Sequence, residues 1–135
     1  MSYYSQIHSL QYEIQHLNYL IGVTEENIRR LKKAKATIEN EKDALNSNRT
    51  QIHSPELSSN CWAGKHANSF LDKRENIQVE FYKMINEQIS KQLTNISEAI
   101  SQSQANIACY FDSIVKKQNQ IERIRDLIHM EEDDH

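Results

Sequence analysis

A stripe of apolar residues that recurs in alternating steps of four and three runs through the first third of the chain. Side chains three and four residues apart lie on the same face of an α-helix, so this spacing predicts one long amphipathic helix over about residues 4–52. The stripe continues without a slip through these positions: Tyr3, Ile7, Leu10, Ile14, Leu17, Ile21, Thr24, Ile28, Leu31, Lys35, Ile38, Lys42, Leu45, Arg49 and Ile52.

The strongest break in this pattern surrounds Pro55. Proline disfavours helix at the residue before it, and the serines and asparagine that follow are turn and cap formers. We therefore expect a bend at about 53–62 and a second helix over about 61–130. The apolar stripe of that helix contains these positions: Phe70, Ile77, Phe81, Ile85, Ile89, Leu93, Ile96, Ile100, Ser103, Ile107, Tyr110, Ile114, Lys117, Ile121, Ile124 and Ile128.

Three features disturb the second helix. Between Ile77 and Leu93 the apolar residues step by four several times in succession, which we interpret as a stutter that straightens a coiled coil locally. The polar run at 101–104 is where we expect a kink, or a break that would create a third helix. The acidic tail at 131–135 repels the negative end of a helix and is expected to fray.

The composition agrees with a thin, all-α protein. Hydrophobic residues make up 38% of the chain and charged residues 26%, which suits a helical rod with one buried stripe better than a compact globule. Two glycines and one proline are too few for a loop-rich or all-β fold. The 135 residues leave room for one domain. The sequence therefore predicts a single domain, residues 1–135, folded as a long antiparallel helical hairpin resembling a coiled coil.

The bend position also predicts how the two helices face each other. Folding about residue 59 pairs positions whose numbers add to about 118. In an in-register parallel homodimer, three basic stripe residues would instead stack on their own copies, which favours the hairpin. In the hairpin register those residues, Lys35, Lys42 and Arg49, lie near Glu80, Glu75 and Asp72, respectively.

The same register leaves the end of the second stripe beyond the first helix. An apolar stripe without a partner in its own chain marks an interface. We therefore expect this segment to bind another protein through Ile114, Ile121, Ile124 and Ile128.

Other classes of function find little support in the sequence. A net charge of −3 gives no pull toward nucleic acid, and none of the six histidines has another at the three- or four-residue spacing of a helical metal site. Cys61 lies close to His66, but a two-helix rod offers no pocket for a nucleophile and its base. We therefore expect no enzyme, no cofactor, no metal and no nucleic-acid partner.

No membrane insertion is expected either. No apolar run approaches the roughly 20 residues that span a bilayer, and the N-terminus lacks the basic and apolar regions of a cleavable signal peptide. A cytoplasmic protein, or one exported by a route without such a peptide, is the expectation.

The segment at the bend carries a specific motif. Trp62 would plug the closed end of the hairpin, while Gly64 and Ala67 would let the facing helix approach closely, and Phe70 would open the second stripe. A Trp-x-Gly in the bend between two long helices resembles the WXG superfamily of type VII secretion.

The flanking residues resemble one branch of that superfamily more closely. Leu31–Lys35, Pro55–Leu57 and Asp72–Glu75 around the Trp-x-Gly are similar to the YwqH-like family, whose members accompany LXG toxins in Gram-positive bacteria. The likeness covers roughly residues 25–80. It implies a chaperone-like targeting factor that pairs with the helical N-terminal domain of an LXG-type toxin, or with another small helical subunit.

Two questions stay open at this point. Secreted members of the superfamily often carry Tyr-x-x-x-Asp/Glu after the hairpin, and no tyrosine here has an acidic residue four positions later. The chain is therefore either exported with a partner that supplies the signal, or stays inside as a chaperone. The alternative function is a self-assembling structural coiled coil with no secretion role, since the first stripe also suits a homodimer of the chain alone.

Overall fold

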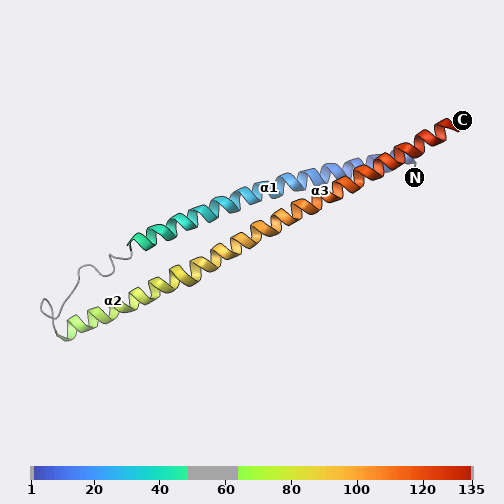
Figure 1. The fold of residues 1–135 in the computed structure, drawn as a ribbon. Helices are drawn as coiled ribbons and strands as arrows, with labels where there is room; N and C mark the ends of the chain where they lie inside the picture. The colour runs from blue at the N-terminus through green and yellow to red at the C-terminus, as the bar shows by residue number, and fades with distance from the viewer. Residues whose placement is uncertain (1, 49–63, 135) are drawn as a thin grey trace. The chain divides into compact units, whose positions relative to one another are not determined.

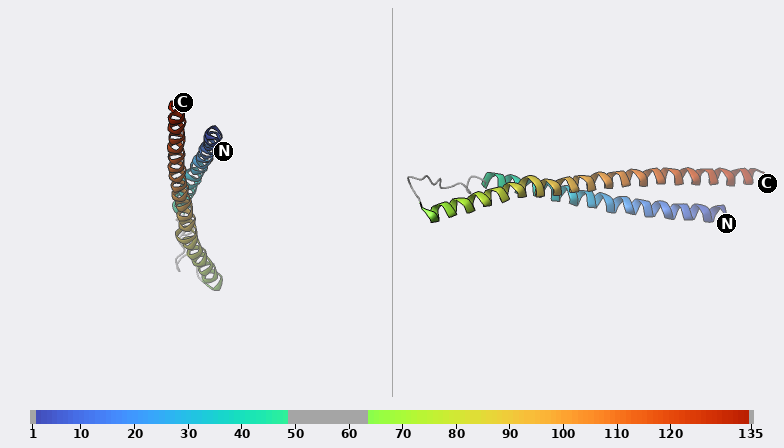
Figure 2. Two further views of the ribbon diagram at one scale, coloured as in Figure 1. Left: turned by 90° about the vertical axis from the view of Figure 1, so that its right-hand side faces the viewer. Right: turned by 90° about the horizontal axis from the view of Figure 1, so that it is seen from below.

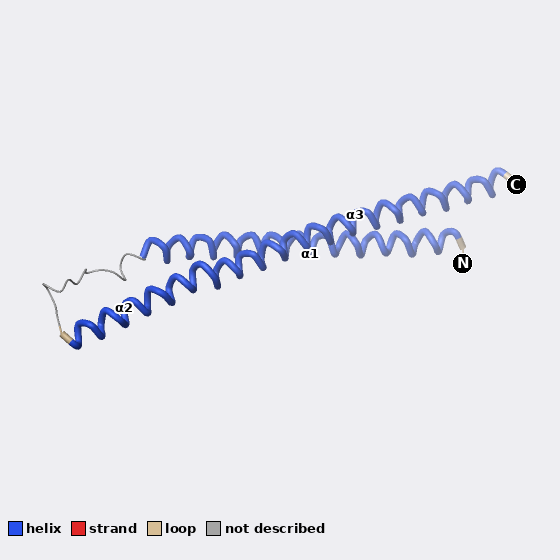
Figure 3. The backbone as a smooth tube through the Cα atoms, turned by 60° about the horizontal axis from the view of Figure 1, so that its bottom comes forward, coloured by secondary structure: helices blue, strands red, loops and turns tan. Residues whose placement is uncertain are grey.

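The structure, a computed structural model, describes residues 2–48 and 64–134 and consists of helices. Helix α1 spans Tyr3–Ser47, α2 spans Lys65–Lys83, the π-helix η2 spans Met84–Ile89, and α3 spans Ser90–Asp133 (Figure 1). The described residues contain no strand (Figure 3). The all-α prediction is confirmed.

The chain forms two compact units. Unit 1 comprises Met1–Leu31 and Ala99–His135, and unit 2 comprises Lys32–Glu98. Each unit therefore contains part of α1 and part of the second half of the chain. No described helix is both long enough and apolar enough to cross a membrane.

In unit 1, α1 and α3 run antiparallel (Figure 2). Lys117 Nζ lies 2.8 Å from Glu13 Oε2. The Tyr3 hydroxyl donates a 3.1 Å hydrogen bond to Glu131 Oε1, and this bond raises the pKa of Tyr3 because ionisation would break it beside a carboxylate. The core of the unit consists of three buried isoleucines from each helix: Ile7, Ile21 and Ile28 of α1, and Ile100, Ile114 and Ile121 of α3.

In unit 2, α1 and α3 also face each other. Lys42 Nζ donates a 3.4 Å hydrogen bond to Ser90 Oγ. The buried hydrophobic residues described in this unit are Ala67 and Ile85, at 1% and 2% exposure. The antiparallel pairing predicted from the sequence is thus present within each unit.

The first stripe is confirmed along the described part of α1. Every predicted member from Tyr3 to Leu45 is buried or half-buried. The helix ends at Ser47, before the predicted residue 52. Arg49 and Ile52, like the predicted bend at 53–62, lie outside the described residues.

The predicted register is wrong. Facing residues have numbers that add to 130 for Glu13 and Lys117, and to 132 for Lys42 and Ser90. Both sums exceed the expected value of about 118 by roughly two heptads. A shift of whole heptads brings stripe residues opposite other stripe residues, so apolar periodicity alone does not distinguish the two registers.

The second stripe differs from its prediction at one place. Buried and half-buried residues recur in alternating steps of four and three from Ala67 to Ile128, except that Ile85, Ile89 and Leu93 follow steps of four in succession. One residue is therefore extra, and η2 lies at this point. A π-helix, bonded from i to i+5, is wound more loosely than an α-helix and absorbs one additional residue. The irregularity is a local π segment, not the predicted stutter.

The expected break at 101–104 does not occur. Helix α3 is continuous from Ser90 to Asp133. Polar residues in this run do not interrupt the stripe, because Ile100 is buried and Ser103 and Ile107 are half-buried. The acidic tail, which we expected to fray, is helical as far as Asp133.

Candidate protein-binding surfaces

The bend motif is described only from Gly64 onward, so Trp62 and Cys61 lie outside the described residues. Gly64 precedes α2 with φ 118°, a backbone conformation that other residues rarely adopt. No neighbouring atom lies within 4 Å of the position that a Cβ of Gly64 would take, so this glycine is explained by its backbone and not by close packing. Ala67 is buried, whereas Phe70 is 46% exposed.

The predicted binding stripe on α3 lies in the core of unit 1. Ile114 and Ile121 are 7% and 6% exposed, and Ile124 and Ile128 are half-buried. The expectation that these residues lack a partner in their own chain is therefore wrong, because the actual register brings α1 alongside them. The exposed apolar side chains lie at other positions.

One exposed apolar group lies on α2. Phe70 and Ile77, one heptad apart, are 46% and 59% exposed. Both belong to the buried stripe predicted from the sequence. The stripe of α3, when followed back through η2 into α2 at the same spacing, instead passes through Arg74, Leu71 and Ala67. Phe70 and Ile77 lie beside that row, and we call them the α2 flank.

A second group, absent from the sites predicted from the sequence, lies on the outer side of α1. Its members follow steps of four, three and four: Tyr12, His16, Tyr19 and Val23. Tyr12 and Tyr19 each come two positions before a stripe residue, Ile14 and Ile21 respectively. Two residues correspond to about 200° of rotation, so this group points away from the core of unit 1. All four side chains are exposed, and we call them the tyrosine face.

The tyrosine face has aromatic and uncharged character. Tyr12 and Tyr19 are 72% and 66% exposed, and the rings of His16 and Tyr19 stack with centroids 6.5 Å apart. Between Ser2 and Thr24 the sequence contains one charged residue, Glu13, and its carboxylate is paired with Lys117 of α3. Depletion of charge and enrichment in tyrosine characterise the centres of protein interfaces.

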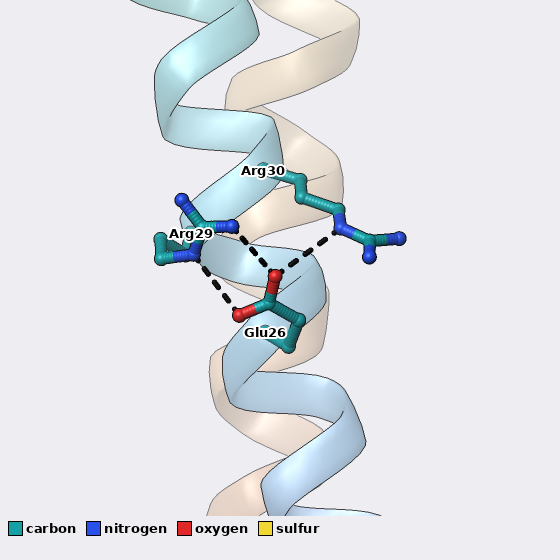
Figure 4. A network of polar contacts seen from close by, with 3 residues as sticks. All are labelled: Glu26, Arg29 and Arg30. Atoms are coloured by element: carbon teal, nitrogen blue, oxygen red, sulfur yellow. Dashed lines mark hydrogen bonds and ion pairs between the residues drawn. The ribbon is translucent and has the colours of Figure 1, made fainter.

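The tyrosine face ends at a charged cluster. Glu26 accepts hydrogen bonds from Arg29 at 2.7 and 3.0 Å and from Arg30 at 3.3 Å (Figure 4). Hydrogen bonding to Arg29 is the main reason that the pKa of Glu26 falls from 4.5 to about 2. Both arginines are exposed, as expected for a solvated helix surface.

A shallow groove runs along the α1–α3 pair inside unit 1. Its walls are formed by Gln6, Ser9, Leu10, Gln120, Arg123 and Ile124. The lining combines two aliphatic side chains with polar ones and brings together no nucleophile and base.

The described residues contain no metal-binding cluster. No group of three His, Cys, Asp or Glu side chains in this part of the chain is placed to hold a metal ion. Cys109 is exposed and His66 is exposed on α2. The Cys61–His66 proximity considered above involves a residue outside the described ranges.

Comparison with known proteins gives a family match that covers most of the chain. A family model described as YwqH-like matches residues 5–126. No curated protein and no solved structure matches the chain.

Proposed function

Because the chain belongs to the YwqH-like family, we propose that it is a non-catalytic, chaperone-like targeting partner of an LXG-type toxin. The partner is the helical N-terminal domain of such a toxin, or another small helical subunit of type VII secretion. Binding occurs by packing of helix against helix. The chain stays in the cytoplasm until its partner is exported, and it either leaves with the partner or remains behind.

The observation that carries this proposal is the balance of buried and exposed apolar side chains. Among the described residues, eight hydrophobic side chains are buried, while eleven large hydrophobic ones are exposed. A single pair of helices can bury only the stripe between them. A surface of this kind is typical of a chain that completes its packing with another protein.

We place toxin binding on the α2 flank. Phe70 and Ile77 lie in the part of the chain, roughly 25–80, whose sequence resembles the family most closely. Ile77, 59% exposed and one heptad after Phe70, leaves apolar area that a partner helix can cover by knobs-into-holes packing. Each square ångström of apolar surface removed from water contributes about 25 cal/mol.

The structural coiled coil is the second candidate. In its simplest form, two copies would pair through the first stripe of α1. In unit 1 that stripe is occupied, since Ile7, Ile21 and Ile28 are 6–8% exposed against α3. This occupancy supports the targeting role over assembly through the stripe.

The test is co-expression with the N-terminal domain of the product of the adjacent large gene, followed by affinity pull-down. Phe70→Ser with Ile77→Ser is expected to abolish the complex. Phe111→Ser with Val115→Ser, at α3 positions 52% and 51% exposed, is the matched control and should leave it intact. Failure of the unaltered chain to bind would overturn the proposal. Loss of binding in both double variants to the same extent would remove the α2 flank as its site.

A further inference from the structure

The buried side chains of α1 and α3 are unevenly divided between the two units. Among the described residues, every buried member of these two helices belongs to unit 1. In the part of α1 that belongs to unit 2, residues 32–47, no side chain is buried, and the same holds for α3 from 90 to 98. The buried residues described in unit 2 are Ala67 of α2 and Ile85 of η2. The core between α1 and α3 therefore lies in unit 1.

The stripe of α1 also changes character between the units. From Tyr3 to Leu31 it contains no charged residue, whereas in unit 2 lysines alternate with aliphatic residues. These four half-buried positions are Lys35, Ile38, Lys42 and Leu45. Withdrawing an ammonium group from water costs free energy unless a close partner compensates for the lost hydration. The lysines therefore weaken the pairing of α1 with α3 in unit 2.

The partners of the stripe lysines differ in the same direction. In unit 1, Lys117 of the α3 stripe lies 2.8 Å from the Glu13 carboxylate. In unit 2, Lys42 Nζ donates its hydrogen bond to the neutral hydroxyl of Ser90, at 3.4 Å. That distance lies beyond the usual range of an N–H···O hydrogen bond, about 2.7–3.2 Å. Lys42 is thus less well compensated than Lys117.

The facing side of unit 2 has weak points of its own. Arg74 and Gln78 occupy half-buried positions of α2, so polar side chains interrupt the stripe there. The π-helix η2 follows at Met84–Ile89. Such segments are rare within α-helices and occur frequently at functional sites. Both sides of unit 2 therefore lack a continuous apolar stripe.

We propose that unit 2 opens and closes as a conformational device while unit 1 stays paired. In the open form, α1 from Lys32 onward separates from η2 and from α3 up to Glu98. A segment held by few apolar contacts opens at a lower free energy than the whole molecule. Opening uncovers Ile38 and Leu45, which the closed hairpin half-buries. The inference concerns the chain alone and does not rest on toxin binding.

Native-state hydrogen exchange of the full chain, followed by nuclear magnetic resonance, tests the proposal. The amides of Ile38 and Ile96 in unit 2 are expected to have protection factors at least about tenfold lower than those of Ile21 and Ile114 in unit 1. Ile96 is the decisive position, because the helix containing it is continuous from Lys65 to Asp133 and end fraying does not reach it. One common protection factor in both units would overturn the proposal.

A variant in unit 1 tests whether the opening is local. Ile121→Val should lower the protection factor of Ile114 about fivefold, because it removes a buried methyl group. The protection factor of Ile96 should stay unchanged, since unit 1 remains paired when unit 2 opens. If the hairpin opened only as a whole, both protection factors would fall equally, and that result would overturn the proposal.

A matched pair of variants in unit 2 tests the role of the lysines. Lys35→Leu with Lys42→Leu should raise the protection factor of Ile96 at least about tenfold, because apolar side chains replace ammonium groups in the stripe. Lys32→Leu with Lys33→Leu, at exposed positions of the same segment, is the control and should leave it unchanged. Ile96 lies on the opposite helix from all four substitutions, so altered helix propensity of α1 does not act on it directly. Equal effects of the two double variants would overturn the proposal.

Discussion

Lys117 and Glu13 are 104 positions apart in the sequence, and their side chains form a 2.8 Å ion pair between α3 and α1 of unit 1. The lysine side chain is 25% exposed and the glutamate 50% exposed. Together with the Tyr3–Glu131 hydrogen bond, this pair defines the register of the two helices. A helix shifted by two heptads would lose both contacts.

The ion pair gives a first prediction. Lys117→Glu should lower the free energy of unfolding by about 1 kcal/mol, because it puts two carboxylates together, and the exchanged double variant Glu13→Lys/Lys117→Glu should recover most of that loss. Urea denaturation measures both. The control is charge reversal in the exposed Asp112–Lys116 pair within α3. It should lower the free energy of unfolding by less than half as much. If the exchange recovers nothing, the two residues are not neighbours.

The second prediction concerns the core of unit 1. Ile121→Ala should reduce the free energy of unfolding by about 2–4 kcal/mol, since it removes methyl groups from a buried site. Leu127→Ala, less than two turns further along the same helix at 44% exposure, should change it by less than about 1 kcal/mol. Thermal and urea unfolding give the values. Equal effects at the two positions would argue for the register predicted from the sequence, which leaves Ile121 outside the hairpin.

A third prediction tests the origin of the π-helix. Deleting Gln88, an exposed residue of η2, should convert the segment to an α-helix and preserve stability, because the steps of four and three then run unbroken. Deleting Gln104, an exposed glutamine within regular α3, should strongly destabilise the protein by turning its two sides about 100° out of phase. Circular dichroism melts compare the two deletions. A Gln88 deletion as damaging as that of Gln104 would refute this explanation.

The charged cluster on α1 gives a fourth prediction. Folding lowers the pKa of Glu26 to about 2, so the cluster favours the folded state fully above pH 4.5 and loses its effect as the pH falls toward 2. Nuclear magnetic resonance of the carboxyl carbon should show the low midpoint. Arg29→Gln should raise this pKa toward its ordinary range, because Arg29 is the main cause of the shift. Arg30→Gln, which removes a weaker partner, should raise it less.

The sequence was sufficient to predict the helices and the core of α1. Ile7, Ile21 and Ile28 are buried at the positions that the steps of four and three assign to them. The prediction is correct because a long helix with a single apolar stripe can bury that stripe in only one orientation. The same periodicity limited the prediction of register, because every shift by whole heptads buries the stripe equally well.

The candidate binding residues were harder to predict for a related reason. Phe70 and Ile77 look like stripe residues when apolar character alone is followed, yet the extra residue in η2 turns α2 so that Ala67 and Leu71 continue the row. The tyrosine face was visible in the sequence as a second series parallel to the first. Its members are tyrosine, histidine and valine. Because they are less hydrophobic than isoleucine and leucine, the apolar periodicity does not reveal this face.

The π segment also bears on how chains of this type change length over evolution. A residue gained or lost within 84–89 can be taken up by local rewinding, whereas the same change in α1 or α3 would put every later contact out of phase. Gaps between related sequences should therefore concentrate in this turn. Alignments that instead open gaps inside the long helices would join positions that do not occupy the same place in the fold.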